Sequence, residues 1–357
     1  MIVDGSKMRA VVVAGQGRIE WRQIPVPVCG DDDVILEVKC AGICGADLHW
    51  ESGEFVPGDT PFVLGHEFAG VICEVGKNMS DRWKVGDRVV SDNTGYACGV
   101  CSACARGDFV HCARRQTLGA GLNGGFAKYC RIPGGALRVH PNAIMRLPDS
   151  VSFEEAAALE PAANAYRAVI QEARVVPGDT VVVAGLGPLG LFSIQMARAA
   201  GASRVIALGR KRDWAVRFPL AEKLGAAELI ATDEVNAAEK ITELYGDDEV
   251  RVVIDAAGTP SVMNEAMEYM QHDGVFVRVG NPAANYNYSL LPLIDKQITV
   301  IGHMGYNTTA WRNTMTLLEN HQLVIASLIT RTLPLEEYRM GFELMRTKQA
   351  AKVILMP

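Results

Sequence analysis

The stretch Thr180-Val-Val-Val-Ala-Gly-Leu-Gly-Pro-Leu-Gly190 decides the fold of this chain. Residues 180–184 form a short apolar, β-branched run, which predicts a strand buried on both faces. The glycines that follow match the pattern Gly-x-Gly-x-x-Gly and open a helical stretch, LGLFSIQMARAAG. Between a strand and a helix, this pattern is the fingerprint of a dinucleotide-binding βαβ unit, whereas alone it would be no more than a glycine-rich turn.

Three glycines of this stretch have separate expected roles. Gly185 makes the tight turn after the strand, Gly187 lets the backbone approach a pyrophosphate, and Gly190 lets the helix pack on the strand. The helix begins near Pro188 and Leu189, where its free N–H groups favour an anion. These five residues are the expected contacts to the phosphates of a dinucleotide.

Apolar strands and amphipathic helices continue to alternate after the fingerprint. The runs SRVIALG, RVVIDAAG and VFVRVG are typical of strands, and helical runs such as AVRFPLAEKLG and SVMNEAMEYMQHDG separate them. Continuous apolar strands between amphipathic helices predict a doubly wound parallel sheet of the α/β class.

The first part of the chain differs, because its short β-branched runs are separated by Gly, Pro and Asp. From Ser152 the sequence becomes Ala- and Glu-rich with helical spacing, and Glu155 completes a capping box. The final run, AKVILMP, is expected to rejoin the β-rich part. The prediction is therefore two domains, with residues 159–297 inserted into a β-rich domain of residues 1–158 and 298–357.

The residue after the second strand of the inserted domain bears on the choice of cofactor. An Asp or Glu there, about 20 residues beyond the glycines, would bind the adenosine ribose hydroxyls. This chain has Gly209 instead, followed at once by the basic residues Arg210, Lys211 and Arg212. A missing carboxylate and nearby cations suit a 2′-phosphate, so NADP is favoured over NAD. A solvated basic loop is the alternative, and Asp213 could still supply the carboxylate.

Four cysteines lie in one stretch at 98–112, CGVCSACARGDFVHC. Cys98, Cys101, Cys104 and Cys112 are spaced so that four thiolates can surround one Zn²⁺ ion tetrahedrally. The alternative, a pair of disulfides, would need an oxidising compartment and usually a small secreted chain. This chain has 357 residues and no basic segment followed by a sustained apolar one at its start, so a structural zinc site is expected.

Composition excludes several classes of function. The hydrophobic fraction of 49% and the charged fraction of 21% are ordinary for a soluble globular protein. The net charge is −6 with no run of five like charges, so neither nucleic acid nor an anionic membrane is an expected partner. No apolar run approaches the roughly 20 residues that span a bilayer. Nine cysteines, four of them assigned to a metal, fit a reducing cytosol, and a cytoplasmic protein is expected.

Three other segments carry possible zinc ligands: Cys44 in GICGADLHW, His66-Glu67 in LGHEFAG, and Glu160 in LEPAANAY. Three protein ligands of these types plus water form the usual catalytic zinc arrangement. Taken singly, each residue is more simply explained as part of the core or of a helix start.

Together with the four cysteines and the glycine fingerprint, these segments resemble the zinc-containing medium-chain dehydrogenase/reductase family, and within it the sorbitol and polyol dehydrogenase branch. The matching pieces occur in the family's order over essentially the whole chain: GICGADLHW, GHEFAG, GDRV, CGVCSACARGDFVHC, LEPAANAYRAV, GLGPLG and AKVILMP. The resemblance implies a GroES-like β domain that carries two zinc ions, and an inserted Rossmann domain that carries the cofactor.

The resemblance also implies roles for individual residues. Cys44, His66 and Glu67 match ligands of the catalytic zinc. Glu160 matches a carboxylate that replaces the second cysteine ligand of the family's alcohol dehydrogenases, and it would bind the metal directly or through water. Asp47 matches a carboxylate that orients a metal-bound histidine.

Proton transfer involves one further match and one departure from the family. His49 matches a histidine often placed in a proton relay. Ala46 replaces the Ser or Thr whose hydroxyl takes the substrate proton, so transfer is expected to use water on the metal, Glu67, Glu160 or His49.

A second departure from the family is Gly305-Tyr306, where sorbitol dehydrogenases tend to carry Arg-Tyr, and it argues against sorbitol itself as the substrate.

The expected function is a zinc-dependent transfer of hydride between NADP(H), or NAD(H), and a secondary alcohol or ketone, such as a polyol or sugar-derived alcohol. Amino-alcohol oxidation of the threonine dehydrogenase type and reduction of a ring ketone are alternatives. A third alternative is a binding or structural protein that kept the fold but lost the catalytic zinc and the chemistry, and only Ala46 favours it. Trp50 and Phe55 are candidate walls of the pocket. Two zinc ions per chain, a small-molecule substrate and a homo-oligomer, dimer or tetramer, are expected.

Overall fold

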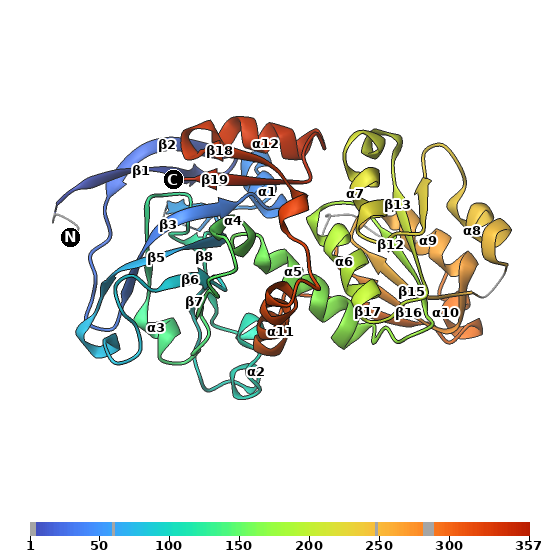
Figure 1. Cartoon of the computed structure of the whole chain (residues 1–357), viewed down its shortest axis with the longest axis horizontal. Helices are drawn as coiled ribbons and strands as arrows, with labels where there is room; N and C mark the ends of the chain where they lie inside the picture. Colours follow the sequence, from blue (N-terminus) through green and yellow to red (C-terminus); the bar gives the residue numbers. More distant parts are fainter. Residues whose placement is uncertain (1–4, 59–60, 247–248, 281–288) are drawn as a thin grey trace. The chain divides into compact units, whose positions relative to one another are not determined.

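The computed structural model describes residues 5–58, 61–246, 249–280 and 289–357, which form two compact units (Figure 1). The first unit comprises Met1–Glu160, Asn307–Glu319 and Ile325–Pro357, and the second comprises Pro161–Tyr306 and Asn320–Val324. The chain returns to the first unit at Asn307 rather than at residue 298. The reason is a sixth strand, β17 (Thr299–Gly302), which pairs with the sheet of the second unit.

The first unit is built mainly from antiparallel strands. A seven-stranded sheet has the order β11-β6-β5-β3-β19-β18, with β10 also paired to β3, and two smaller sheets have the orders β2-β1-β4 and β7-β8-β9. The strands are β1 (Lys7–Gly15), β2 (Arg18–Pro25), β3 (Val34–Gly42), β4 (Phe62–Val63), β5 (Glu67–Val75), β6 (Arg88–Ser91), β7 (Thr94–Tyr96), β8 (Gln116–Leu118), β9 (Gly121–Leu122), β10 (Tyr129–Ile132), β11 (Ile144–Arg146), β18 (Ile329–Pro334) and β19 (Lys352–Met356).

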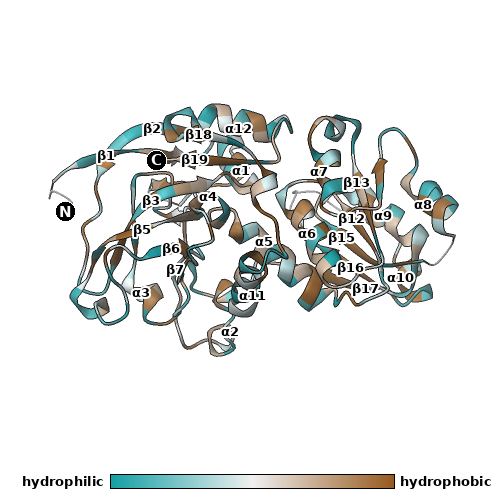
Figure 2. Cartoon of the chain, viewed as in Figure 1, coloured by the Kyte–Doolittle hydropathy of each residue, from teal (hydrophilic) through white to brown (hydrophobic). Residues whose placement is uncertain are grey.

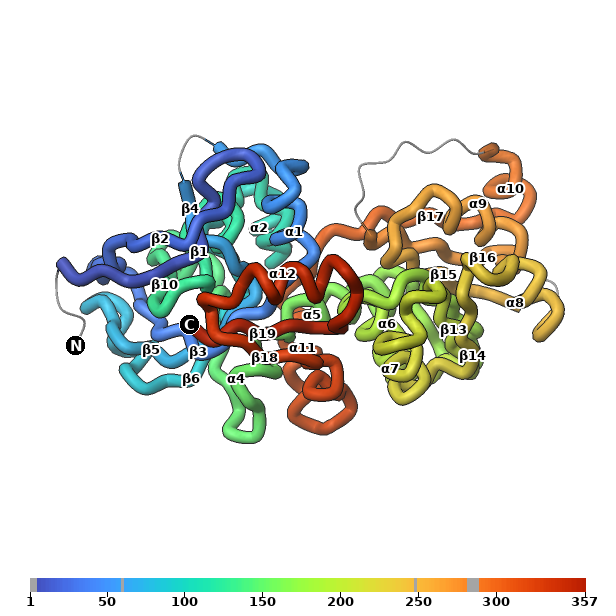
Figure 3. Tube along the Cα trace, turned by 90° about the horizontal axis from the view of Figure 1, so that it is seen from above, coloured from blue at the N-terminus to red at the C-terminus, as the bar shows by residue number. Residues whose placement is uncertain are grey.

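The C-terminal strand joins this unit as predicted, because β19 pairs with β3 and lies beside β18 (Figure 3). Short helices surround the sheets: α1 (Gly45–Ser52), α2 (Ser102–Ala105), α3 (Gly134–Leu137), α4 (Phe153–Ala156), α11 (Thr308–Glu319) and α12 (Tyr338–Arg346). The core of the unit contains three fully buried phenylalanines, Phe68, Phe126 and Phe342.

The predicted helix after Ser152 is interrupted in the structure. Ser152 caps α4 and forms the expected capping box with Glu155. A second helix, α5 (Leu159–Tyr166), follows, and the chain continues as a π-helix over Arg167–Glu172. The boundary between the two units therefore falls inside α5 rather than at its start.

The second unit confirms the predicted doubly wound parallel sheet. Its six strands are all parallel in the order β14-β13-β12-β15-β16-β17. They are β12 (Thr180–Ala184), β13 (Arg204–Gly209), β14 (Glu228–Ala231), β15 (Val250–Asp255), β16 (Met270–Arg278) and β17, and they are hydrophobic along much of their length (Figure 2). The helices are α6 (Pro188–Ala199), α7 (Arg217–Lys223), α8 (Ala237–Tyr245), α9 (Pro260–Tyr269) and α10 (Leu291–Asp295).

The strand order places the switch point of this sheet between β12 and β15. From β12 the chain moves outward to β13 and β14, and then crosses back to β15 and moves the other way. Right-handed crossovers put α6 and α7 on one face and α8 and α9 on the other. Ligands of such sheets bind at the carboxyl ends of the strands, beside the switch point.

Among the described residues, no helix is long and apolar enough to cross a membrane.

Candidate metal and cofactor sites

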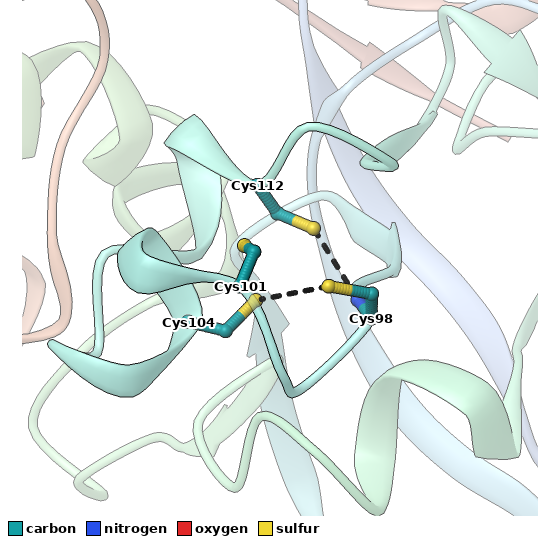
Figure 4. A group of neighbouring side chains, drawn as sticks. All are labelled: Cys98, Cys101, Cys104 and Cys112. Atoms are coloured by element: carbon teal, nitrogen blue, oxygen red, sulfur yellow. Dashed lines mark hydrogen bonds between the residues drawn. The ribbon is translucent and has the colours of Figure 1, made fainter.

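The four cysteines of the 98–112 stretch converge in the first unit, where Figure 4 shows their side chains turned toward one another. Cys98 follows β7, Cys101 precedes α2, Cys104 lies in α2, and Cys112 ends the 3₁₀ turn Phe109–His111. Gly99 and Gly107 both have positive φ, which allows the tight turns that bring the four cysteines together.

The geometry of this cluster fits a tetrahedral metal rather than disulfides. All four sulfurs lie within 4.8 Å of one another, and Cys98 Sγ is 4.0 Å from Cys104 Sγ. A disulfide requires about 2.05 Å, whereas sulfurs at 2.3 Å from one zinc ion are roughly 3.8 Å apart. All nine cysteines are unpaired. A hydrogen bond from the Cys104 backbone lowers the pKa of the Cys101 thiol to about 6, which favours the thiolate that zinc binds.

A buried histidine–aspartate pair lies against this cysteine lobe. His140 Nε2 is 2.5 Å from Asp92 Oδ2, and both residues are buried. The His140 ring stacks on Phe109 with ring centroids 4.1 Å apart, and Val139 packs against the cysteines. The pair therefore anchors the lobe to the strand that ends at Ser91.

A second group of ligand-type side chains brings together three segments of the first unit. Cys44 precedes α1, while His66 and Glu67 stand at the start of β5, which pairs with β3. One ligand atom from each of the three residues lies within 4.8 Å of the others. The structure thus brings together the thiol, imidazole and carboxylate side chains that lie in separate segments of the sequence.

Asp47 lies directly beside this group. Its side chain is fully buried, Oδ2 accepts a hydrogen bond from the Cys44 backbone at 2.8 Å, and Oδ1 lies 3.7 Å from His66 Nδ1. A carboxylate on that side of the ring would leave Nε2 for a metal, as in many histidine sites. Burial raises the pKa of the Asp47 carboxyl to about 6.

Lys352, at the start of β19, is fully buried and was not anticipated as a site residue. Its Nζ contacts Glu67 Oε2 and donates a hydrogen bond of 2.9 Å to the Ile43 carbonyl. Glu67 Oε1 is also buried, but it has no hydrogen-bond partner among the residues that the structure describes. One carboxylate oxygen is therefore held by the lysine, and the other is left available to a metal.

The charge of this group also fits a divalent cation. The thiol of Cys44 and the carboxyls of Asp47 and Glu67 can each carry a negative charge, and Lys352 supplies one fixed positive charge nearby. Burial raises the pKa of the Cys44 thiol despite the opposing effects of His66 and Lys352, so the thiolate would be stabilised by further positive charge. A zinc ion would supply it, so the donor set and the charge both fit zinc.

Two other predicted residues lie outside the tight group. Glu160, on α5, is not among the mutually close ligand atoms. Burial lowers the pKa of His66, but Cys44, then Asp47 and finally Glu160 raise it, so that it lies well above its ordinary value. His49, on α1, points its Nδ1 toward Glu54 Oε2 at 2.7 Å. The structure therefore gives His49 a carboxylate partner that the sequence did not indicate.

The aromatic residues proposed as pocket walls pack on one another. Trp50 makes edge contacts with Phe55 and Phe62, with centroids 5.3 and 5.2 Å apart, and Phe55 also lies 5.1 Å from the His49 ring. Trp50 is half-buried against the core of the first unit. Tyr306 is buried; it is the second residue of Gly305-Tyr306, the position at which sorbitol dehydrogenases tend to carry Arg-Tyr.

The glycine fingerprint lies at the carboxyl end of β12, and α6 begins at Pro188 directly after Gly187. A side chain on Gly190 would collide with the Gly185 carbonyl, which explains the third glycine. A side chain on Gly187 would meet nothing within 4 Å. Packing does not require this glycine, so the open space is consistent with close approach by a ligand.

The end of β13 shows where the carboxylate of Asp213 goes. Asp213 is buried, and its Oδ2 accepts a hydrogen bond from the Arg210 backbone at 2.9 Å. The side chains of the basic run are exposed, and Lys211 Nζ pairs with Glu234 at 3.2 Å. One oxygen of Asp213 therefore caps a 3₁₀ turn, while among the described residues its Oδ1 has no hydrogen-bond partner.

Comparisons with known proteins agree with this geometry. The chain matches the family Alcohol dehydrogenase GroES-like domain over residues 30–142 and the family Zinc-binding dehydrogenase over residues 188–320. An uncharacterised zinc-type alcohol dehydrogenase-like protein of Escherichia coli K12, YdjL, is 40% identical over 98% of both chains. The chain therefore belongs to the zinc-containing medium-chain dehydrogenase/reductase family, and it is an oxidoreductase of that NAD(P)-dependent class.

Other relatives differ in their named substrates. An L-threonine 3-dehydrogenase of Bacillus velezensis is 33% identical, over 99% of this chain and 100% of its own. A D-arabitol-phosphate dehydrogenase of Enterococcus avium is 34% identical, over 96% and 94% respectively. A provisionally assigned zinc-binding dehydrogenase of Sinorhizobium meliloti, solved with NADP bound, superimposes with a TM-score of 0.87 at 27% identity, over 99% of this chain and 100% of that one.

Proposed function

We propose that this protein is a zinc-dependent dehydrogenase that transfers hydride between NADP(H) and a secondary alcohol or ketone of the polyol or sugar-derived type. One observation carries the proposal: Cys44, His66 and Glu67 converge from separate segments, and a buried oxygen of Glu67 has no hydrogen-bond partner within the described part of the chain. No packing role explains this combination, whereas a metal ion would satisfy the oxygen and the charge.

The protein's own residues would prepare the site for catalysis. When bound, zinc supplies a Lewis acid for the substrate oxygen, and the dinucleotide supplies the hydride chemistry. Asp47 lies 3.7 Å from the His66 ring, where it would orient a metal-bound imidazole, and Lys352 holds one oxygen of Glu67 while balancing its charge. Both Asp47 and Lys352 are buried.

Proton transfer would follow a route other than the usual hydroxyl, since Ala46 cannot donate or accept. We propose that His49 passes the proton to solvent, because its side chain is 34% exposed. Glu54 Oε2 lies 2.7 Å from His49 Nδ1 and orients the ring. A histidine oriented by a carboxylate is suited to general base catalysis near neutral pH. Glu67 and Glu160 remain the alternatives for the first transfer.

The cofactor preference rests on the end of β13. Gly209 offers no carboxylate, and Asp213 is turned inward onto the Arg210 backbone. In the described part of the chain, the exposed guanidinium groups of Arg210 and Arg212 have no ion-pair partner, so they are available to a 2′-phosphate. We therefore propose NADP(H) as the better cofactor, which steady-state kcat/KM values with both cofactors would test.

The four-cysteine lobe is proposed to hold a second zinc ion, which stabilises the fold and takes no part in the chemistry. Its closed set of four sulfurs leaves no position for a substrate. Two zinc ions per chain are therefore proposed. A content of one zinc ion per chain would instead favour a protein that kept the fold but lost the catalytic zinc.

The substrate class is proposed from the site rather than from a single relative. A screen of polyols, sugar alcohols, sugar phosphates and L-threonine with NADP⁺, and of the corresponding ketones with NADPH, would separate the alternatives. Turnover of polyols in preference to threonine supports the proposal. A clear preference for threonine would favour the amino-alcohol alternative.

A homo-oligomer is also proposed. In the described residues β17 pairs only with β16, and an apolar group lies exposed on and beside this edge: Leu290, Leu291, Ile294, Val300 and Met304. An unpaired strand edge with exposed apolar side chains is typical of an interface. Light scattering after gel filtration would distinguish a dimer or tetramer from a monomer.

A further inference from the structure

A buried ion pair lies at the carboxyl ends of two central strands in the second unit. Asp255 is the last residue of β15 and Arg278 the last residue of β16. Arg278 Nη1 donates to Asp255 Oδ2 at 2.5 Å, and Nη2 donates to the Gly258 carbonyl. The Asp255 side chain is 0% exposed and that of Arg278 is 20% exposed.

The same pair holds the turn between β15 and α9. Asp255 Oδ1 accepts hydrogen bonds from the backbones of Ala257 at 3.1 Å and Gly258 at 2.7 Å. The Asp255 carbonyl accepts two more, from Val279 at 2.9 Å and Gly280 at 2.8 Å. Asp255 and Arg278 thereby tie the turn after β15 to the backbone after β16.

This turn borders the proposed phosphate-binding loop. A side chain on Gly185 would come within 2.6 Å of Ala257 N, so the two backbones are in direct contact. The turn therefore lies at the switch point between β12 and β15, where a dinucleotide passes from one half of the sheet to the other. Gly185 is held separately by its own hydrogen bond to the Leu208 carbonyl at 2.8 Å.

The charge of the pair matters at this place. Burial raises the pKa of the Asp255 carboxyl, while the Gly258 N–H and the Arg278 guanidinium oppose that effect. Without the arginine, a buried anion or a protonated acid would remain beside the site for an anionic pyrophosphate. Either state would weaken the turn's hydrogen bonds or repel the ligand.

We infer that Asp255 and Arg278 are a positioning pair for the dinucleotide, which fixes the turn against Gly185 and keeps the surface under the nicotinamide half electrically neutral. The inference rests on the proposed use of a dinucleotide. The pair belongs to the half of the sheet formed by β15, β16 and β17. The adenosine half of the dinucleotide should therefore bind independently of the pair. Neither residue is a catalytic residue, because each acts through the backbone it holds.

The test measures binding by isothermal titration calorimetry with two ligands, NADPH and its adenosine fragment 2′,5′-ADP. Arg278→Met should raise the Kd for NADPH about tenfold, equal to about 1.4 kcal/mol, and change the Kd for 2′,5′-ADP less than threefold. Arg278→Lys keeps the charge but loses the second hydrogen bond, and a rise of about threefold is expected. This milder variant also serves if Arg278→Met fails to fold.

The chain offers a matched control at the opposite end of β15. Arg251 on β15 pairs with Asp179, just before β12, at 2.7 Å. Arg251→Met should lower the Tm much as Arg278→Met does, yet leave the Kd for NADPH within twofold of the wild type. A merely structural role for Arg278 would give both variants the same effect on binding.

The outcomes separate this inference from the proposed function. If the wild type binds neither NADPH nor NADH, the proposed function is wrong. If the wild type binds NADPH but Arg278→Met binds it equally well, the positioning role is wrong. Equal losses for NADPH and 2′,5′-ADP, or an equal loss in Arg251→Met, would also overturn it.

Discussion

The pair formed by Lys352 and Glu67 gives the most quantitative prediction. Lys352→Met removes the charge but keeps a side chain of similar length in a position that is 0% exposed. It leaves Glu67, 1% exposed, without its cation, and it also removes the hydrogen bond to the Ile43 carbonyl. Breaking a buried ion pair from one side costs about 3–5 kcal/mol. At about 2–4 °C per kcal/mol, the Tm of the first unit should fall by roughly 10 °C.

Differential scanning calorimetry in a Cys44→Ala background, where the zinc proposed to bind Glu67 is lost, measures this effect, and a double-mutant cycle in that background isolates it. Glu67→Gln combined with Lys352→Met should recover much of the loss, because no buried charge is then left alone, and the coupling energy should be about 2 kcal/mol or more. Lys84→Met, at an exposed lysine of the same unit, is the control and should change stability by under about 0.5 kcal/mol. A loss below about 1 kcal/mol in Lys352→Met would refute the role assigned to this pair.

Three further predictions concern the metals and the cofactor. Cys104→Ser should lower the Tm and the zinc content by about one ion while the remaining folded enzyme keeps its kcat, and retention of both ions would contradict this. Cys44→Ala should abolish turnover and also remove about one ion with little change in circular dichroism, whereas wild-type kcat would rule out the proposed site. Arg210→Gln with Arg212→Gln should reduce the NADP/NAD ratio of kcat/KM about ten- to a hundredfold, since a single charge-assisted contact to the 2′-phosphate contributes roughly 1.5–3 kcal/mol. An unchanged ratio, as expected for the exposed control Lys223→Gln, would exclude the basic run from phosphate binding.

The structure also changes how the cofactor test is best made. Introducing a carboxylate at Gly209 looks direct from the sequence, but a side chain there would come within 2.9 Å of Leu186 and Phe218 and 3.1 Å of Asp213. Such a variant would disturb packing and charge together. Substituting the exposed arginines changes only the charge, so its result can be interpreted.

Local patterns predicted the parts of the fold that depend on local chemistry. The fingerprint at 180–190, the capping box at Ser152 and the C-terminal strand are each encoded by a short run of residues, and the structure has each of them. The domain boundary was harder to predict from the sequence, because β17 is short and belongs to the second unit only through its pairing with β16. The π-helix at 167–172 also has no local signal in the sequence.

The candidate site was predictable in its ligands but not in their partners. Cys44, His66 and Glu67 are recognisable by type, whereas Lys352 is 285 residues from Glu67 and meets it only through the pairing of β19 with β3. A lysine inside the apolar run AAKVILMP was the available signal, because a buried lysine requires an acidic partner. Asp255 and Arg278 are separated in the same way and meet only because β15 and β16 are neighbours.

The most direct test of the central claim is a crystal structure with diffraction data collected above and below the zinc absorption edge. An enzyme with both proposed zinc sites should give two anomalous peaks per chain, one among Cys98, Cys101, Cys104 and Cys112, and one beside Cys44 and His66. A single peak among the four cysteines, with none beside Cys44, would contradict the proposed zinc-dependent chemistry.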